Sequence, residues 1–176
     1  GRSVTSLVLA GDSAGGTLTI VTAMTLRDTP ADVPVIAQFP IYPAADTAHE
    51  YPSFDAFGDG YLLTKESMRW FDRAYRADYT DPRGAPMQGD LSNLPPALII
   101  TAGLDPLRDQ GRAYAAALIQ HGIATTYREA VGNIHGFITI RKAIPSSQGD
   151  YAGALTALKA VVTEAEANRV MAQAAQ

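Results

Sequence analysis

The sequence predicts an α/β fold in which helices cover a parallel sheet. Two observations lead to this prediction: short apolar runs bounded by glycine or proline alternate with segments of helical periodicity, and 176 residues suffice for one domain with a hydrophobic core. Parallel neighbours need a crossover connection, so each intervening helix is expected to be a right-handed crossover on one face of the sheet. The expected architecture is doubly wound.

The first part of the expected core consists of two strands and the helix between them. Residues 6–10 (SLVLA) form a run typical of a fully buried strand, and residues 15–27 follow as a helix that is apolar on most sides. Residues 35–41 (VIAQFPI) are expected to form the second strand.

The second part of the expected core repeats this alternation. Residues 97–102 (ALIITA) predict a third strand, and residues 107–121 predict a helix that Gly122 ends as a C-cap. Residues 125–130 favour a fourth, more polar strand, and residues 149–167 a long final helix. The expected apolar face of that helix holds Tyr151, Leu155, Leu158 and Val162.

A long segment between Pro43 and Pro96 does not follow the alternation. It contains a loop rich in Asp, Pro, Tyr and Phe, and in it Thr64 can cap a helix whose first turn holds Glu66. The apolar face of that helix would hold Met68, Phe71 and Tyr75. An insertion of this length between two strands favours a cap over an active site, and an additional packing layer is the alternative.

We therefore expect three parts along the chain. Residues 1–43 would supply the first strand, the first helix and the second strand of the core. Residues 44–90 would form the cap insertion, and residues 91–176 the remainder of the core.

Composition and charge exclude several classes of function. The chain has no cysteine, which excludes disulfides, thiolate metal sites and a cysteine nucleophile. Its formal net charge of -4 does not favour a nucleic-acid partner, because such binding usually needs a basic patch. No apolar run is long enough to cross a bilayer, so we expect no membrane span and, given the absence of cysteine, a cytoplasmic location.

Residues 11–16 (GDSAGG) stand directly after the first expected strand and directly before the first expected helix. In this context G-x-S-x-G is typical of a nucleophile elbow, a tight and strained turn that holds a serine hydroxyl clear of the sheet. Bulky side chains at Gly11 or Gly15 are expected to collide with the neighbouring backbone. Ser13 would lie at a helix N-terminus, where developing negative charge is favoured, and the N–H of Ala14 could donate to an oxyanion.

The alternative for this turn is a glycine-rich connection that packs tightly or cradles a phosphate. A phosphate-binding loop would show a Gly-x-Gly-x-x-Gly or Gly-Lys-Ser pattern, and neither occurs here. The nucleophile elbow is therefore favoured.

A serine nucleophile needs a base, and three histidines are available. His121 is expected in the last turn of a helix beside Gly122, where a structural role is favoured, and His49 is expected to be solvated in the cap loop. His135 follows the fourth strand, at the edge of a parallel sheet where catalytic groups gather. We therefore select His135.

The base needs an acid to orient it, and Asp105 follows the third strand. Asp105 before Pro106 is also a good helix N-cap, so a structural role is a strong alternative. Asp109 is better explained as a complement to the helix dipole. The order Ser13, Asp105, His135 favours the catalytic role, because α/β-hydrolases place nucleophile, acid and histidine in this order.

These motifs resemble those of the hormone-sensitive-lipase family of α/β-hydrolases, in the esterase branch whose elbow is Gly-Asp-Ser-Ala-Gly. The matching segments are residues 11–16 (GDSAGG), 105–109 (DPLRD) and 135–137 (HGF), and residues 94–100 (LPPALII) with Tyr42 and Pro43 resemble linking segments of the family. The resemblance extends from the first residues to about Lys159. It implies hydrolysis of carboxylic esters with short to medium acyl chains, through an acyl-enzyme and without a metal or organic cofactor. It also implies roles for Ser13 as nucleophile, His135 as base and Asp105 as its orienting acid.

The chain also departs from the family. Members carry, before the elbow, a His-Gly-Gly-Gly motif whose N–H groups form most of the oxyanion hole, and this chain has none. Strands beside the nucleophile strand and the N-terminal cap helices also lack counterparts, so the chain resembles the C-terminal part of an α/β-hydrolase fold. We expect the chain alone to be inactive or very slow. We also expect the apolar edge of residues 6–10 to be covered by another copy or by the missing segment as a separate chain.

Substrate contacts and the reaction class stay open at this point. Asp12, Tyr42, Leu62 and Phe71 are candidate substrate contacts, and Tyr61 and Trp70 could help to line an acyl pocket. Asp12 could instead form the local turn, and aromatic residues at helical spacing are more often packing residues. One alternative function is a non-catalytic small-molecule receptor, as in the gibberellin receptors that resemble this family. Another is an amidase, peptidase or acyltransferase, because the same triad serves these reactions.

Overall fold

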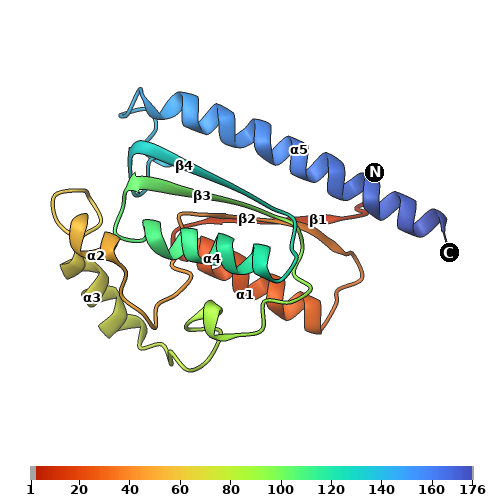
Figure 1. Ribbon diagram of the computed structural model, residues 1–176, viewed down its shortest axis with the longest axis horizontal. Helices are drawn as coiled ribbons and strands as arrows, with labels where there is room; N and C mark the ends of the chain where they lie inside the picture. The colour runs from red at the N-terminus through yellow and green to blue at the C-terminus, as the bar shows by residue number, and fades with distance from the viewer. Residues whose placement is uncertain (1–2, 176) are drawn as a thin grey trace.

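The computed structural model describes residues 3–175 and shows one parallel sheet with helices on both faces (Figure 1). The strands lie in the order β1-β2-β3-β4, and each pairs in parallel with its neighbour. Their bounds are Leu7–Asp12 (β1), Val35–Ile41 (β2), Ala97–Leu104 (β3) and Thr125–Ile134 (β4). The α/β fold with a parallel sheet and flanking helices is therefore confirmed.

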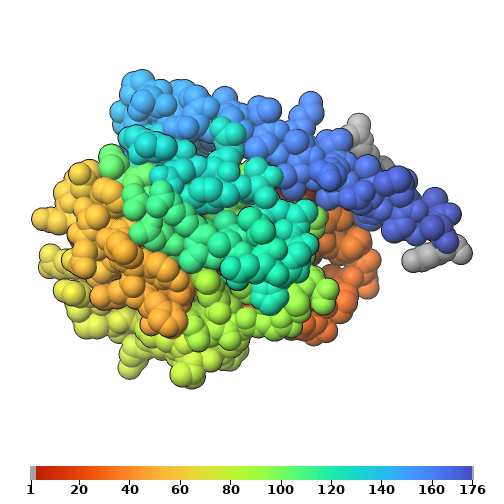
Figure 2. All heavy atoms as spheres, viewed as in Figure 1, coloured from red at the N-terminus to blue at the C-terminus, as the bar shows by residue number. Residues whose placement is uncertain are grey.

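Three long helices form the outer layers. Helices α1 (Ala14–Asp28) and α4 (Arg108–Gln120) cover one face of the sheet, and α5 (Ser147–Ala174) crosses the other face (Figure 1). Figure 2 shows the C-terminal part of α5 projecting beyond the rest of the molecule. Within the described part of the chain no helix, α5 included, combines the length and apolar composition needed to cross a membrane.

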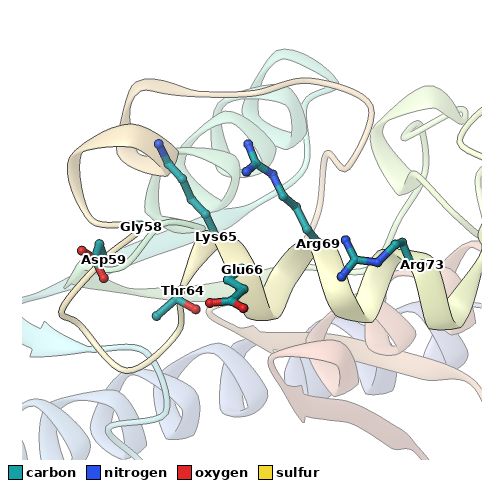
Figure 3. A pocket seen from close by; sticks show the side chains of 7 residues that line it. All are labelled: Gly58, Asp59, Thr64, Lys65, Glu66, Arg69 and Arg73. Carbon is teal, nitrogen blue, oxygen red and sulfur yellow. The ribbon is translucent and has the colours of Figure 1, made fainter.

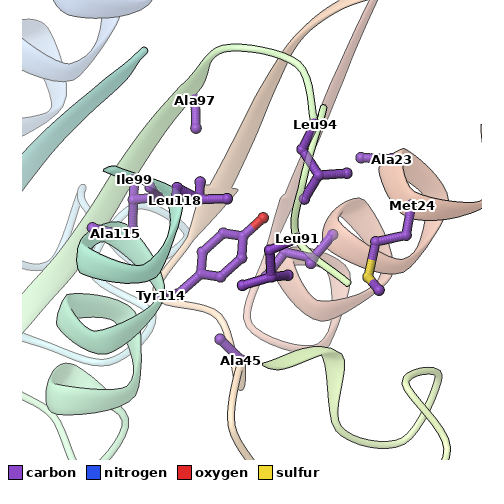
Figure 4. Packing of buried hydrophobic residues seen from close by; sticks show 11 residues of the cluster. Ala23, Met24, Ala45, Leu91, Leu94, Ala97, Ile99, Tyr114, Ala115 and Leu118 are labelled. Atoms are coloured by element: carbon purple, nitrogen blue, oxygen red, sulfur yellow. The ribbon is translucent and has the colours of Figure 1, made fainter. Parts of the chain in front are cut away.

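The core consists of two apolar layers that share the central strand β3. Because successive side chains of a strand point to opposite faces, Ala97 and Ile99 pack toward α1 and α4, while Leu98 and Ile100 pack toward α5. Figure 4 shows the first layer, in which the Tyr114 ring lies among aliphatic side chains. The buried Tyr114 hydroxyl donates to Gln38 Oε1 at 2.8 Å, which satisfies a polar group that would otherwise be costly to bury.

Strand β1 is less buried than the sequence predicts. Its residues alternate between half-buried and exposed, and Val8 retains 37% of its accessible surface. The prediction of a fully buried strand is wrong because β1 is an edge strand, which pairs with β2 alone among the described residues. The expectation of an unpaired edge on this strand agrees with that topology.

The final helix is longer than expected, and its packed face agrees with the expected face only in part. Small and medium side chains pack it on the sheet: Ala154, Ala157, Leu158 and Val161. Leu158 was expected on this face and lies there, whereas Leu155, also expected there, is exposed. The difference arises because small alanine side chains let the helix lie close to the strands.

The segment between β2 and β3 contains two short helices, α2 (Pro52–Ala56) and α3 (Lys65–Tyr75), and a 3₁₀ turn at Pro86–Gln88. Thr64 caps α3 as expected: its hydroxyl accepts from Ser67 N–H at 3.1 Å, and the Ser67 hydroxyl accepts from Thr64 N–H at 3.1 Å. The expected apolar face of α3 is largely exposed at Phe71 and Tyr75. Both helices lie beside the carboxyl ends of the strands (Figure 1).

Candidate active site

Ser13 occupies a strained turn between β1 and α1. Its backbone has φ 55° and ψ -120°, a conformation that residues other than glycine rarely adopt. Three hydrogen bonds hold the turn: Ser13 N–H donates to Ile41 O at 2.9 Å, and Ser13 O accepts from Gly16 N–H at 2.9 Å and Thr17 N–H at 3.2 Å. The surrounding structure thus fixes the strained backbone, as expected for a nucleophile elbow.

The glycines of the elbow have unequal roles. A Cβ atom on Gly11 would lie 2.3 Å from Gly15 O, so the predicted collision is confirmed there. At Gly15 a Cβ would meet nothing within 4 Å, and the prediction for this position is wrong because its side-chain direction is open. Gly16 is the second constrained position, since its Cβ would lie 3.0 Å from Pro43 Cβ.

A continuous hydrogen-bonded chain connects Ser13, His135 and Asp105. His135 Nε2 lies 2.8 Å from Ser13 Oγ, and His135 Nδ1 lies 2.7 Å from Asp105 Oδ2. Each residue directly follows the last residue of a strand: β1 ends at Asp12, β3 at Leu104 and β4 at Ile134. Since carboxyl ends of parallel strands meet at one edge, residues far apart in sequence become neighbours.

Asp105 has two roles at once. Its Oδ1 accepts from Leu107 N–H at 2.8 Å, which shapes the turn before α4, and its Oδ2 contacts His135. The side chain is completely buried, so both contacts satisfy a carboxylate that water cannot reach. The two interpretations left open by the sequence, a turn-forming and an orienting acid, are therefore compatible.

Tyr42 lies against the catalytic histidine candidate. Its ring centroid is 4.6 Å from that of His135, with 55° between the ring planes, and 5.7 Å from that of Phe137. The Tyr42 side chain is fully buried, and its hydroxyl donates to Asp12 Oδ2 at 3.3 Å. Burial raises the pKa of the Tyr42 hydroxyl, so this group stays a donor.

The other candidate substrate contacts lie in the segment that contains α2 and α3. Leu62 is exposed at φ 74°, and its Cδ2 lies 3.8 Å from the position of a Cβ on Gly136, which places it beside the His135 turn. Phe71 is exposed and packs edge to face on Trp70 at 5.4 Å, and Tyr61 packs in the same way on Phe57 at 5.6 Å. Among the described contacts, the structure thus brings Leu62 near the triad but not Phe71.

The remaining histidines lie outside this site. His121 is exposed at the end of α4, as expected. His49 is mostly exposed, but its Nδ1 also lies 3.0 Å from Oδ2 of the buried Asp46. Tyr51 donates to the same carboxylate oxygen at 2.6 Å. Asp46 therefore anchors the loop after β2, a role that no motif in the sequence indicates.

Thr139 is a residue near the site that the sequence does not reveal. Thr139 lies four residues beyond His135, and its hydroxyl donates to Asp12 Oδ2 at 3.3 Å. A single threonine between Ile138 and Ile140 gives no recognisable signal in the sequence, and only the fold shows that this turn returns to the elbow.

A shallow, open depression lies along α3 and the loop before it (Figure 3). Its volume is about 340 Å³, and its lining residues are Gly58, Asp59, Thr64, Lys65, Glu66, Arg69 and Arg73. Lys65 is paired with Asp55. The depression includes no triad residue. Within residues 3–175 no group of three or more histidine, aspartate or glutamate side chains is arranged to hold a metal ion.

Comparison with known proteins defines the class. A sequence model described as the alpha/beta hydrolase fold matches residues 2–139, and the chain belongs to this family. It is 40% identical over 143 residues to carboxylic ester hydrolase LipN of Mycobacterium tuberculosis, covering 76% of this chain and 38% of LipN. It is 39% identical over 136 residues to an ethyl acetate hydrolase of Pseudomonas putida, covering 75% of this chain and 43% of that protein.

Solved structures agree with this assignment. A serine-to-alanine mutant of LAE6, an α/β-hydrolase enzyme from the metagenome of Lake Arreo, superposes with a TM-score of 0.77 at 41% identity, covering 84% of this chain and 48% of that one. A thermostable esterase of Pseudomonas putida gives a TM-score of 0.77 at 31% identity, covering 84% and 49%. The chain thus spans about half the length of the relatives it matches.

Proposed function

We propose that this chain carries the catalytic triad of a carboxylesterase, with Ser13 as nucleophile, His135 as general base and Asp105 as the acid that orients the imidazole. The observation that carries the proposal is the pair of contacts at 2.8 Å and 2.7 Å that join the three side chains through the two nitrogens of His135. The elbow backbone and the names of the similar proteins, which are ester hydrolases, support it.

The reaction proceeds in two halves. Ser13 Oγ attacks the ester carbonyl carbon while His135 Nε2 takes the hydroxyl proton, which gives a tetrahedral intermediate. The bond to the alcohol oxygen then breaks, His135 returns the proton to that oxygen, and an acyl-serine remains. Water attacks the acyl carbon with His135 again as base, and the carboxylic acid leaves as Ser13 regains its proton.

Two further features assist these steps. Asp105 lies in a fully buried position, where its carboxylate stabilises the imidazolium that forms twice in each cycle. Ala14 is the first residue of α1, so its N–H has no place in the helical hydrogen-bond pattern and can donate to the oxyanion. The esters that we expect as substrates have short to medium acyl chains, in line with the ethyl acetate hydrolase relative.

The chain by itself should be a slow catalyst. Ala14 is the one oxyanion donor that we assign, and the loss of one donor typically lowers kcat about 10²–10³-fold. Hydrolysis of p-nitrophenyl butyrate tests the proposal: we expect a slow release of p-nitrophenolate that the Ser13→Ala variant loses. His121→Ala, which changes an exposed histidine outside the site, should retain the wild-type rate. Equal rates in Ser13→Ala and wild type would contradict the proposal.

The same assay separates the reaction classes that the triad can serve. An esterase should cleave the ester and leave an anilide of the same acyl group essentially uncleaved, whereas an amidase or peptidase should cleave both, because esters are intrinsically more reactive than amides. A non-catalytic receptor would bind such compounds without cleaving either.

A further inference from the structure

A cluster of three side chains joins the turns around the triad. Asp12 Oδ2 accepts from the Tyr42 hydroxyl and from the Thr139 hydroxyl, each at 3.3 Å. Asp12 directly precedes Ser13, Tyr42 directly follows β2, and Thr139 lies in the turn that begins with His135. One carboxylate therefore connects the segment of the nucleophile, the end of a second strand and the segment of the base.

The backbone of Tyr42 is held in a strained conformation, which a side chain that only fills the core would not need. Its backbone has φ 34°, in the region that favours glycine, and its N–H donates to Ile100 O at 2.6 Å. Such a conformation costs on the order of 1–3 kcal/mol and persists only where the surroundings determine it. It directs a fully buried ring against the His135 imidazole.

The contacts of His135 show what this ring can do. Hydrogen bonds through Nε2 to Ser13 and through Nδ1 to Asp105 fix the two nitrogens of the imidazole. They constrain the positions of the nitrogens more tightly than the tilt of the ring plane, because a hydrogen bond tolerates small angular deviations. A side chain packed against the imidazole limits that tilt, and the Tyr42 ring, 4.6 Å away between centroids, is in position to do so.

We propose that Tyr42 is a positioning residue for His135, and that Asp12 acts through it by fixing the Tyr42 hydroxyl and, through Thr139, the turn after the histidine. This inference rests on the proposed function, because it assigns a role within the same triad. It also replaces a substrate contact by Tyr42, whose side chain has no exposed surface.

Two variants of Tyr42 separate the ring from the hydroxyl. Tyr42→Leu removes the aromatic ring and should lower kcat for p-nitrophenyl butyrate about 10-fold or more with little change in KM, because small misplacement of a catalytic group is costly. Tyr42→Phe keeps the ring and should retain most of the activity, with a loss of about 3-fold. The matched control is Tyr114→Phe, which removes the hydroxyl of an equally buried tyrosine on the other face of the sheet and should leave kcat unchanged.

A spectroscopic measurement makes the test independent of turnover. The proton that His135 Nδ1 shares with Asp105 Oδ2 should give a downfield ¹H resonance that is protected from exchange with water. In Tyr42→Leu it should exchange about 10-fold faster or broaden away, while Tyr114→Phe should leave it unchanged. The resonance can follow this pattern in the wild type and the two variants although the wild type does not hydrolyse the ester. In that case the positioning role stands and the proposed function fails.

The double variant Asp12→Ala/Tyr42→Phe tests whether Asp12 acts through Tyr42, and it serves even where Tyr42→Leu does not fold. Each change removes the hydrogen bond between the Tyr42 hydroxyl and Asp12, so the double variant should be within about 2-fold of Asp12→Ala alone. Fully multiplicative losses would overturn the coupling. An unchanged kcat and an unchanged imidazole resonance in Tyr42→Leu would overturn the positioning role itself.

Discussion

At the scale of single residues, Ser13, Asp105 and His135 are supported by three different backbone devices. The elbow holds Ser13 at a positive φ, a turn fixed by Leu107 N–H holds Asp105, and the short turn after β4 holds His135 beside Gly136, which has φ 78°. These devices belong to the ends of strands, so the hydrogen-bonded chain depends on the sheet below it.

The first prediction concerns the acid. Asp105→Asn keeps the size of the side chain but favours the wrong tautomer of His135, so we expect kcat to fall about 10³–10⁴-fold with a small change in KM. Asp109→Asn, four residues further on, is the control and should change kcat little. Similar losses in the two variants would show that the contact from Asp105 to His135 has no catalytic role.

The second prediction concerns the unequal glycines of the elbow. Gly11→Ala places a methyl group 2.3 Å from Gly15 O and should lower the free energy of unfolding by about 1–3 kcal/mol. Gly15→Ala enters open space in the first turn of α1 and should be neutral or raise it by about 0.5–1 kcal/mol. Urea denaturation of both variants checks the pair. A Gly15→Ala variant as unstable as Gly11→Ala would contradict the geometry.

Much of the site follows from the sequence at this scale, because each motif has local signals. The elbow glycines surround Ser13, and the order of serine, aspartate and histidine narrows the choice to Asp105 and His135. Tyr42 and Thr139 could not be placed in the same way, since their contacts with His135 and Asp12 join segments that only the folded sheet brings together.

At the scale of elements, α3 differs from the three long helices because none of its side chains is buried. Trp70, Phe71 and Tyr75 are exposed on it, and its N-terminal capping box is a main local source of stability. The sequence pattern predicts this helix and its N-cap at Thr64. The same pattern does not say whether another element packs on the apolar face of the helix.

The third prediction follows from that exposure. Thr64→Ala removes the side chain that caps α3 and should lower the local stability of the helix by about 1 kcal/mol. Because α3 contributes no buried side chain, the change should raise hydrogen exchange of its amides and leave that of β3 as in the wild type. Equal changes in exchange throughout the molecule would show instead that α3 unfolds only with the core.

Asp109 connects two elements, and the fourth prediction concerns its charge. The carboxylate accepts from Ser53 N–H in α2 at 3.0 Å, and from Arg108 Nε at 2.8 Å and Arg112 Nη1 at 3.1 Å on α4. Burial alone would raise the pKa of Asp109, but the hydrogen bond from Arg108 and the nearby positive charges outweigh it, and the net shift is downward.

A lowered pKa in the folded state means that the ionised form of Asp109 contributes stability above its unfolded-state pKa, which is near 4. This contribution is lost as the pH falls through the lower folded-state pKa. We expect Asp109→Asn to lower the free energy of unfolding by about 1–3 kcal/mol at pH 7, and by less as the pH falls below about 4. Denaturation curves at several pH values check this, and a difference that grows toward acid pH would contradict it.

At the scale of the whole molecule, β1 is an open edge of the sheet that the described residues form, and the chain spans 38% to 49% of the lengths of the relatives named above. Unpaired backbone groups along an edge strand readily pair with another chain. We propose that a second copy or a separate segment covers this edge. We therefore expect association in sedimentation-velocity experiments, with amides of β1 protected in the associated species. A monomer at all concentrations, with fast exchange throughout β1, would contradict this proposal.

The overall arrangement was predictable because the alternation of strands and helices fixes parallel order, but the position of a strand within the sheet was not. Residues 6–10 have the composition of a central strand, yet β1 lies at the edge among the described residues. Composition records how buried a strand could be, whereas its neighbours depend on which other strands are present.

The central claim, that Ser13 is a nucleophile activated by His135, is tested most directly by covalent labelling with a fluorophosphonate probe and mapping of the modified peptide. Labelling needs the serine and its base but no complete oxyanion hole, so it suits a slow catalyst. We predict modification of Ser13 alone in the wild type, strongly slowed labelling in His135→Ala, and unchanged labelling in His121→Ala. Labelling of other serines at the same rate, or of Ser13 equally in wild type and His135→Ala, would contradict the account.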